Sequence, residues 1–93
     1  MIKSFGDKMT EQFYITGKSK KIPAAIHKAT IRKLSYLNNA VDINDLKIPP
    51  GNRLESLKGN YEGYYSIRIN DQYRIIFTFE KEDAYDVRIV DYH

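Results

Sequence analysis

The residues best suited to chemistry stand at the end of the chain, where Asp91, Tyr92 and His93 follow a run of strand-forming residues. An imidazole titrates near neutral pH and a nearby carboxylate can orient it, so these residues are candidates for general acid or base catalysis. Side chains alternate along a strand, which predicts Asp91 and His93 on one side and Tyr92 on the other unless the end bends. The alternative is a frayed polar terminus without a function.

Cations in the same half of the chain are candidates for binding a negatively charged group. Lys58 precedes Gly59 where one expected strand ends, and Arg68 and Arg74 flank Asn70-Asp71, a signal for a hairpin loop of two to three residues. A hairpin closed by these two residues puts the arginines on opposite faces of the sheet. Arg74 then shares its face with isoleucines, where a cation needs an anion. The alternative for each cation is a solvated or snorkelling side chain.

Other charged residues are weaker candidates. Glu55 is a candidate general base, although a single strand carboxylate is more often a surface group. Arg53 and three lysines of a flexible segment, Lys18, Lys20 and Lys21 (the linker lysines), are candidate contacts for RNA phosphates. The alternative for the linker lysines is a solvated loop.

The pattern of apolar residues, caps and turns predicts the elements that position these side chains. Asp7 is suited to cap a helix over Lys8–Ile15, and Pro23 to begin a second helix that ends near Asn38. Lys33 interrupts the apolar stripe of that second helix. Strands are expected at Ile2–Phe5, Arg53–Leu57, Tyr64–Ile69, Tyr73–Phe79 and Ala84–Val90, with a short turn at Ile43–Leu46. The fold class is therefore α+β, with an N-terminal strand and two helices packed on an antiparallel β-sheet meander.

Length and composition limit the function classes. The 93 residues suffice for one domain, covering 1–93, and a hydrophobic content of 42% excludes a disordered tail. The chain has no Cys and only two His, far apart, so we expect no disulfide, thiol nucleophile, metal site or cofactor. A net charge of +3 modestly favours an acidic partner. Without a long apolar run, we expect a cytoplasmic protein that does not contact a membrane.

Three blocks of sequence, in order, resemble one known family. Pro49-Pro50-Gly51-Asn52-Arg53-Leu54 leads to Leu57-Lys58-Gly59, then Gly63-Tyr64-Tyr65 runs through to Tyr73-Arg74-Ile75, and Ala84-Tyr85 through to Asp91-Tyr92-His93 closes the chain. Together they resemble the HigB-type toxins of the RelE/ParE superfamily, also called the plasmid maintenance killer family. The likeness extends from Ile2 to the last residue.

This resemblance implies a RelE-like fold and the toxin role in a type II toxin–antitoxin system. Such toxins are ribosome-dependent endoribonucleases that cleave mRNA in the A site without a metal or cofactor. The expected partners are a HigA-like helix-turn-helix antitoxin, the ribosome and mRNA. Operator DNA would be bound only through the antitoxin complex.

The resemblance also implies residue roles. Lys58 and Arg74 match family positions that we assign to the phosphate oxygens, and the end of the chain matches a terminal Asp-Tyr-His. His93 is then the expected general acid, with Asp91 holding its tautomer, and Tyr92 stacks on a base or orients the phosphate. Glu55 stands where one branch of the family has a His, which makes it the candidate base. Arg68 is a weaker candidate for an RNA contact.

Two other functions remain open on sequence grounds. A toxin of the same superfamily that resembles ParE would inhibit gyrase and cleave no RNA. A protein with a degenerate catalytic site would act only by binding its antitoxin and, through it, operator DNA. The matches at Lys58 and at Asp91-Tyr92-His93 favour RNA cleavage.

Overall fold

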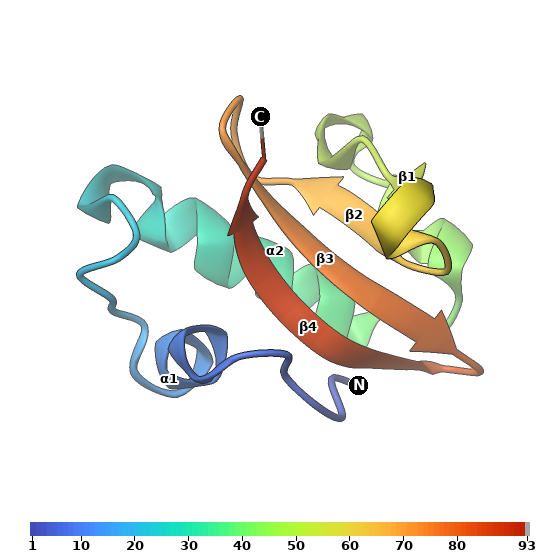
Figure 1. The fold of residues 1–93 in the computed structure, drawn as a ribbon, viewed down its shortest axis with the longest axis horizontal. Helices are drawn as coiled ribbons and strands as arrows, with labels where there is room; N and C mark the ends of the chain where they lie inside the picture. Colours follow the sequence, from blue (N-terminus) through green and yellow to red (C-terminus); the bar gives the residue numbers. More distant parts are fainter. Residues whose placement is uncertain (93) are drawn as a thin grey trace.

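Two α-helices lie against one face of a four-stranded antiparallel sheet in the computed structural model, which describes residues 1–92 (Figure 1). The strands β1 (Glu55–Ser56), β2 (Tyr65–Arg68), β3 (Tyr73–Glu80) and β4 (Asp83–Asp91) are neighbours in chain order. The helices are α1 (Lys8–Thr16) and α2 (His27–Asn39). Short 3-10 turns form at η1 (Ala24–Ile26), η2 (Ile43–Lys47), η3 (Pro50–Asn52) and η4 (Gly59–Tyr61). The predicted α+β class is confirmed.

The first helix follows its sequence signals. The Asp7 carboxylate accepts a hydrogen bond of 2.7 Å from the Thr10 N–H, which is the expected N-cap. Gly17 ends the helix in the left-handed region, with φ of 75°, and its N–H donates to the Phe13 carbonyl at 2.7 Å. Both ends of the predicted helix are therefore confirmed to within one residue.

The second helix starts later than predicted and contains a buried lysine. Pro23 precedes the 3-10 turn η1, and α2 begins only at His27. Lys33, which interrupts the apolar stripe of this helix in the sequence, is only 6% exposed. Its ammonium donates to Asn52 Oδ1. Burial, together with Arg32 and Arg68, lowers the pKa of Lys33 below 10.5. Lys33 therefore links α2 to the Pro-Pro-Gly-Asn-Arg-Leu segment.

The N-terminal segment pairs with β4 through isolated bridges and does not form the full strand that was predicted. Ile2 and Phe5 make parallel bridges to Ala84 and Val87. Backbone hydrogen bonds of 2.8–3.1 Å run in both directions between residues 1–6 and β4. The segment thereby covers part of the edge of β4.

The strand expected over Arg53–Leu57 is shorter in the structure. Only Glu55 and Ser56 pair with β2, opposite Ser66 and Tyr65. Arg53 takes a left-handed conformation, with φ of 46°, at the end of η3, which is incompatible with a regular strand.

The β2–β3 hairpin corrects the predicted placement of two arginines. Its closing backbone hydrogen bond joins the Ile69 N–H to the Tyr73 carbonyl at 2.9 Å, which leaves a loop of residues 70–72. Arg68 lies directly opposite Arg74, so the two side chains share a face and the predicted opposite placement is wrong. The third loop residue shifts the register by one, and such a shift exchanges the faces of all side chains on one strand.

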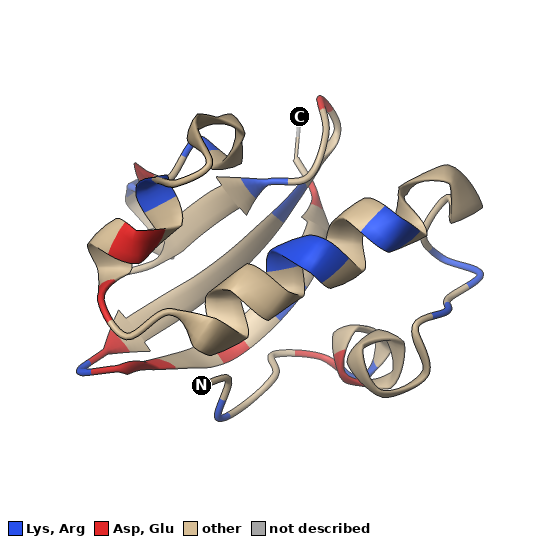
Figure 2. Ribbon diagram, turned by 180° about the vertical axis from the view of Figure 1, so that it is seen from behind, with Lys and Arg blue, Asp and Glu red and all other residues tan. Residues whose placement is uncertain are grey.

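The two faces of the sheet differ in what covers them. Ile67, Ile75, Phe77 and Ile89 pack with Phe13, Leu34 and Leu37 of the helices. Strand side chains alternate, so Ser66, Arg68, Arg74 and their cross-strand neighbours point away from α2. We call this second surface the open face. In Figure 2, which views the molecule from behind, α2 lies in front of the sheet. In Figure 1, from the opposite side, η4 lies in front of the sheet and therefore on the side of the open face.

Candidate functional site

Arg74 is the centre of the candidate site on the open face. Arg74 is only 7% exposed. Its Nη1 donates to Ser66 Oγ, and its Nη2 donates to Glu55 Oε1 at 3.1 Å. The Tyr92 ring lies against the same guanidinium, with its centroid 5.3 Å from Cζ. These contacts fix the planar fork of donors before any ligand binds, which lowers the entropy lost on binding.

The pairing of Glu55 with Arg74 bears on its predicted role as a base. Only one carboxylate oxygen is engaged, and the side chain of Glu55 is 52% exposed. The second oxygen therefore remains accessible to a ligand. A carboxylate in this position can hold Arg74 and still accept a proton from a bound hydroxyl group.

The last two described residues are held by the β2–β3 loop. The Tyr92 N–H donates to the Gln72 carbonyl at 2.6 Å, and Gln72 Nε2 donates to Asp91 Oδ2 at 3.0 Å. Tyr92 turns toward Arg74, whereas Asp91 lies opposite Tyr73 in the neighbouring strand. The alternation predicted for these two residues therefore matches the structure. His93 lies outside the described residues.

Ser66 and Gln72 belong to this site and were missed by sequence reasoning. Ser66 is fully buried and contacts Arg74 directly, and Gln72 contacts the chain end. A three-residue loop in the hairpin would have predicted Ser66 on the face of Arg74. Nothing in the sequence marked Gln72.

Lys58 and Arg53 lie near β1 and both are exposed. Lys58 caps η4, which closes the β1–β2 hairpin on the side of the open face. Its ammonium makes no hydrogen bond or ion pair within residues 1–92, so it is available to a ligand. The structure thus brings together Glu55, Arg74 and Tyr92. Asp91 is next to Tyr92 but lies on the other side of β4, and Lys58 makes no contact with these residues.

The remaining predicted cations fall into two places. Arg68 lies beside Arg74 on the open face and pairs with the exposed Asp71. The linker lysines are exposed and line a hollow of about 330 Å³, and Lys18 and Lys20 also line another of about 600 Å³. The linker between α1 and α2 lies at the opposite end of the molecule from β1 and η4 (Figures 1 and 2). It therefore forms a separate basic surface.

A further tyrosine–carboxylate cluster lies farther along the open face. The Tyr64 hydroxyl donates to Asp86 Oδ2, and Arg88 pairs with the same oxygen at 3.1 Å. The hydrogen bond to the Asp86 carboxylate, with burial second, raises the pKa of Tyr64 above 10.0. Gly6 packs so closely on Arg88 that an added Cβ would clash with the guanidinium Nε. The cluster therefore ties the N-terminal segment to β4.

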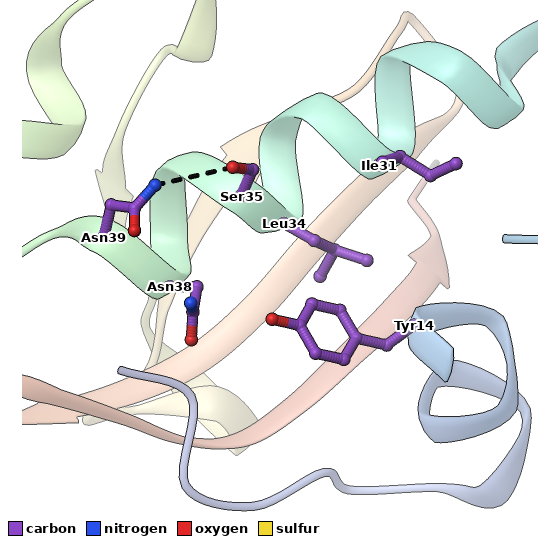
Figure 3. A pocket seen from close by; sticks show the side chains of 6 residues that line it. All are labelled: Tyr14, Ile31, Leu34, Ser35, Asn38 and Asn39. Carbon is purple, nitrogen blue, oxygen red and sulfur yellow. Dashed lines mark hydrogen bonds between the residues drawn. The ribbon is translucent and has the colours of Figure 1, made fainter. Parts of the chain in front are cut away.

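Another hollow, of about 250 Å³, lies between the two helices (Figure 3). Tyr14, Ile31, Leu34, Ser35, Asn38 and Asn39 line it. Asn38 Oδ1 accepts from the Ile2 N–H at 2.9 Å, and Asn39 Nδ2 reaches Ser35 Oγ at 3.5 Å. None of the predicted site residues lines this hollow.

Two properties of residues 1–92 bear on other functions. No cluster of three or more His, Asp or Glu side chains in this part of the chain has the arrangement of a metal site. No helix over the same residues has the length and apolar character needed to cross a bilayer.

The fold is shared with solved bacterial toxins. A chain of the heterotetrameric YoeB–YefM toxin–antitoxin complex from Staphylococcus aureus matches with a TM-score of 0.65 and 25% identity, over 100% of this chain and 95% of that one. YafQ from E. coli matches with a TM-score of 0.60 and 15% identity, over 98% and 91% of the two chains. Two helices on one face of a four-stranded antiparallel sheet, together with these matches, show a RelE-like toxin fold.

The sequence comparisons give the family. Residues 3–93 match the family described as RelE-like toxin of type II toxin–antitoxin system HigB. Toxin HigB-1 of Vibrio cholerae is 51% identical over 80 residues, which are 85% of this chain and 84% of that protein. Endoribonuclease HigB of Proteus vulgaris is 34% identical over 93 residues, the full length of both. The chain belongs to the HigB-like toxin family, and its system includes an antitoxin partner.

Proposed function

We propose that this toxin is a ribosome-dependent, metal-independent endoribonuclease of the cytoplasm that cleaves mRNA in the ribosomal A site. The observation that carries the proposal is the arrangement around Arg74, where a preorganised guanidinium, a carboxylate and an aromatic ring share the open face. In RNA, the guanidinium can bind a phosphate, the carboxylate a hydroxyl group and the aromatic ring a base. The name of the Proteus vulgaris relative, Endoribonuclease HigB, supports the endoribonuclease part of this proposal.

The reaction follows from the chemistry of RNA. The 2′-oxygen forms a bond to phosphorus, the bond from phosphorus to the 5′-oxygen breaks, and one proton leaves the first oxygen while another reaches the second. Glu55 accepts the first proton and His93 donates the second, with Asp91 fixing the tautomer of His93. Arg74 and Lys58 neutralise the charge that develops on the phosphorane.

The remaining candidates serve binding. Tyr92 stacks on a base beside the scissile bond, and stacking on aromatic rings contributes about 1–3 kcal/mol per base. Arg53, Arg68 and the linker lysines contact RNA phosphates. The antitoxin is a HigA-like helix-turn-helix protein, and operator DNA is bound only through the toxin–antitoxin complex.

Mapping of mRNA ends after brief induction without the antitoxin tests this function. We expect new ends at a fixed position within codons, and the same ends when purified protein is mixed with ribosomes carrying mRNA but not with mRNA alone. A fall in DNA synthesis before any fall in translation would instead indicate a gyrase inhibitor. Cleavage of naked mRNA at an equal rate would contradict ribosome dependence.

A variant that ends at Asp91 tests the role of the chain end. Removing residues 92 and 93 takes away no buried side chain that the structure describes, so the melting temperature should change little. Cleavage should fall by at least about 100-fold, because a general acid contributes roughly 10²–10⁴-fold. Full activity of the truncated protein would refute the assignments of Tyr92 and His93.

A further inference from the structure

Gln72, in the β2–β3 loop, makes two contacts with the chain end. Its carbonyl accepts from the Tyr92 N–H at 2.6 Å, and its side-chain amide donates to Asp91 Oδ2 at 3.0 Å. One residue of the β2–β3 loop therefore binds both the backbone and a side chain of the last described residues.

The loop that carries Gln72 is itself fixed. Asn70 Oδ1 accepts hydrogen bonds from the N–H groups of Gln72 and Tyr73, at 2.9 and 2.7 Å. Arg68 also pairs with Asp71 across this loop. An anchored loop can restrain a chain end that would otherwise fray, since terminal residues are ordered only where they are tied down.

The contact with the chain end determines where Tyr92 lies. Beyond β4, which ends at Asp91, Tyr92 continues the pairing of β4 with β3 by one residue, and its ring lies against Arg74. Tyr92 is 41% exposed, so burial alone does not hold it there. The hydrogen bond from Gln72 to Asp91 holds the preceding residue and thereby the direction of the strand.

We infer that Gln72 is a positioning residue for RNA cleavage, which holds Asp91 and Tyr92 so that the Tyr92 ring stays against the Arg74 guanidinium. This inference rests on the proposed function. Gln72 acts through the chain end and does not itself touch the reacting atoms. Its amide can be replaced by another donor of similar reach, but not by an acceptor, because its partner is a carboxylate.

Four variants test this role in ribosome-dependent cleavage. Gln72→Ala should lower the single-turnover rate about tenfold, equivalent to ~1.4 kcal/mol, with little change in melting temperature. Gln72→Lys keeps a donor toward Asp91 and should restore most of the rate, whereas Gln72→Glu should be at least as slow as Gln72→Ala. Gln12→Ala, at an exposed glutamine of α1, is the matched control and should cleave normally.

A double-variant cycle separates positioning from a general structural role. In a Tyr92→Ala background, Gln72→Ala should cause a clearly smaller loss than in the wild type, because the ring it positions is gone. Amide hydrogen exchange at Tyr92, followed by NMR, should be faster in Gln72→Ala than in the wild type and should recover in Gln72→Lys. This measurement requires no catalysis.

Each outcome decides between the two proposals. A wild-type protein that cleaves no ribosome-bound mRNA refutes the proposed function. If the wild type is active, then normal cleavage by Gln72→Ala, unchanged exchange at Tyr92, or an undiminished loss in the Tyr92→Ala background refutes the role of Gln72 alone.

Discussion

Glu55 offers the sharpest test of the proposed chemistry, because it has two possible roles that differ in size. Glu55→Gln keeps an oxygen that can accept from Arg74 Nη2, at a contact that measures 3.1 Å in the wild type. It removes the negative charge and the ability to take up a proton. A role in holding Arg74 should survive this change largely intact, whereas a role as general base should not.

The structure sets the magnitude of each effect. The side chain of Glu55 is 52% exposed, so solvent screens its ion pair with Arg74, and such pairs contribute about 0–1 kcal/mol. A general base contributes roughly 10²–10⁴-fold, or ~2.7–5.4 kcal/mol. We therefore expect Glu55→Gln to lower cleavage at least about 100-fold and to shift the melting temperature by no more than about 8 °C.

Single-turnover cleavage of mRNA on purified ribosomes, with thermal unfolding followed by circular dichroism, measures both effects. Glu62→Gln is the matched control, since Glu62 is exposed at the end of η4 and makes no ion pair within residues 1–92. A Glu55→Gln protein whose rate lies within about threefold of the wild type would refute the assignment of Glu55 as base. Glu55 would then serve only to hold Arg74.

Three further predictions concern lysines. Lys58→Ala should lower cleavage about 10²–10³-fold without changing the melting temperature. Lys47→Ala, at an exposed lysine, is the control. Equal losses of rate and stability in Lys58→Ala would indicate a structural lysine. For Lys33, the folded pKa lies below 10.5, so the unfolded chain binds its proton more tightly and stability should rise as the pH approaches 10.5. Chemical denaturation should show that rise relative to Lys33→Met, and parallel pH profiles would contradict it. Changing all three linker lysines to Ala should reduce the slope of log K against log salt for ribosome binding by up to about 2.7, and an unchanged slope would exclude them from the RNA interface.

Local signals in the sequence determined much of the secondary structure. The cap at Asp7 and the left-handed Gly17 bound α1 because each acts within one helical turn. Alternating β-branched and aromatic residues located β2, β3 and β4 for the same short-range reason. These elements, in this order, suffice to give the α+β class.

The sequence also supplied most of the candidate residues but not their neighbours. Arg74 and Glu55 were both predicted, yet their contact joins residues 19 positions apart and depends on how three strands pair. Gln72 and Asp91 are separated by the same distance along the chain. No local sequence pattern predicts such a contact, because each of these polar residues could equally lie on the surface without a partner.

Tertiary structure alone decided which face each cation takes. A loop of three residues, where two were assumed, moved Arg68 and Arg74 onto the same face of the sheet, since strand side chains alternate and a shift of one residue reverses them. Packing likewise buried Lys33, because the Asn52 amide oxygen that receives its ammonium comes from a distant turn. The sequence determined which side chains are present and in which elements they lie, whereas strand register and helix packing decided which of them meet.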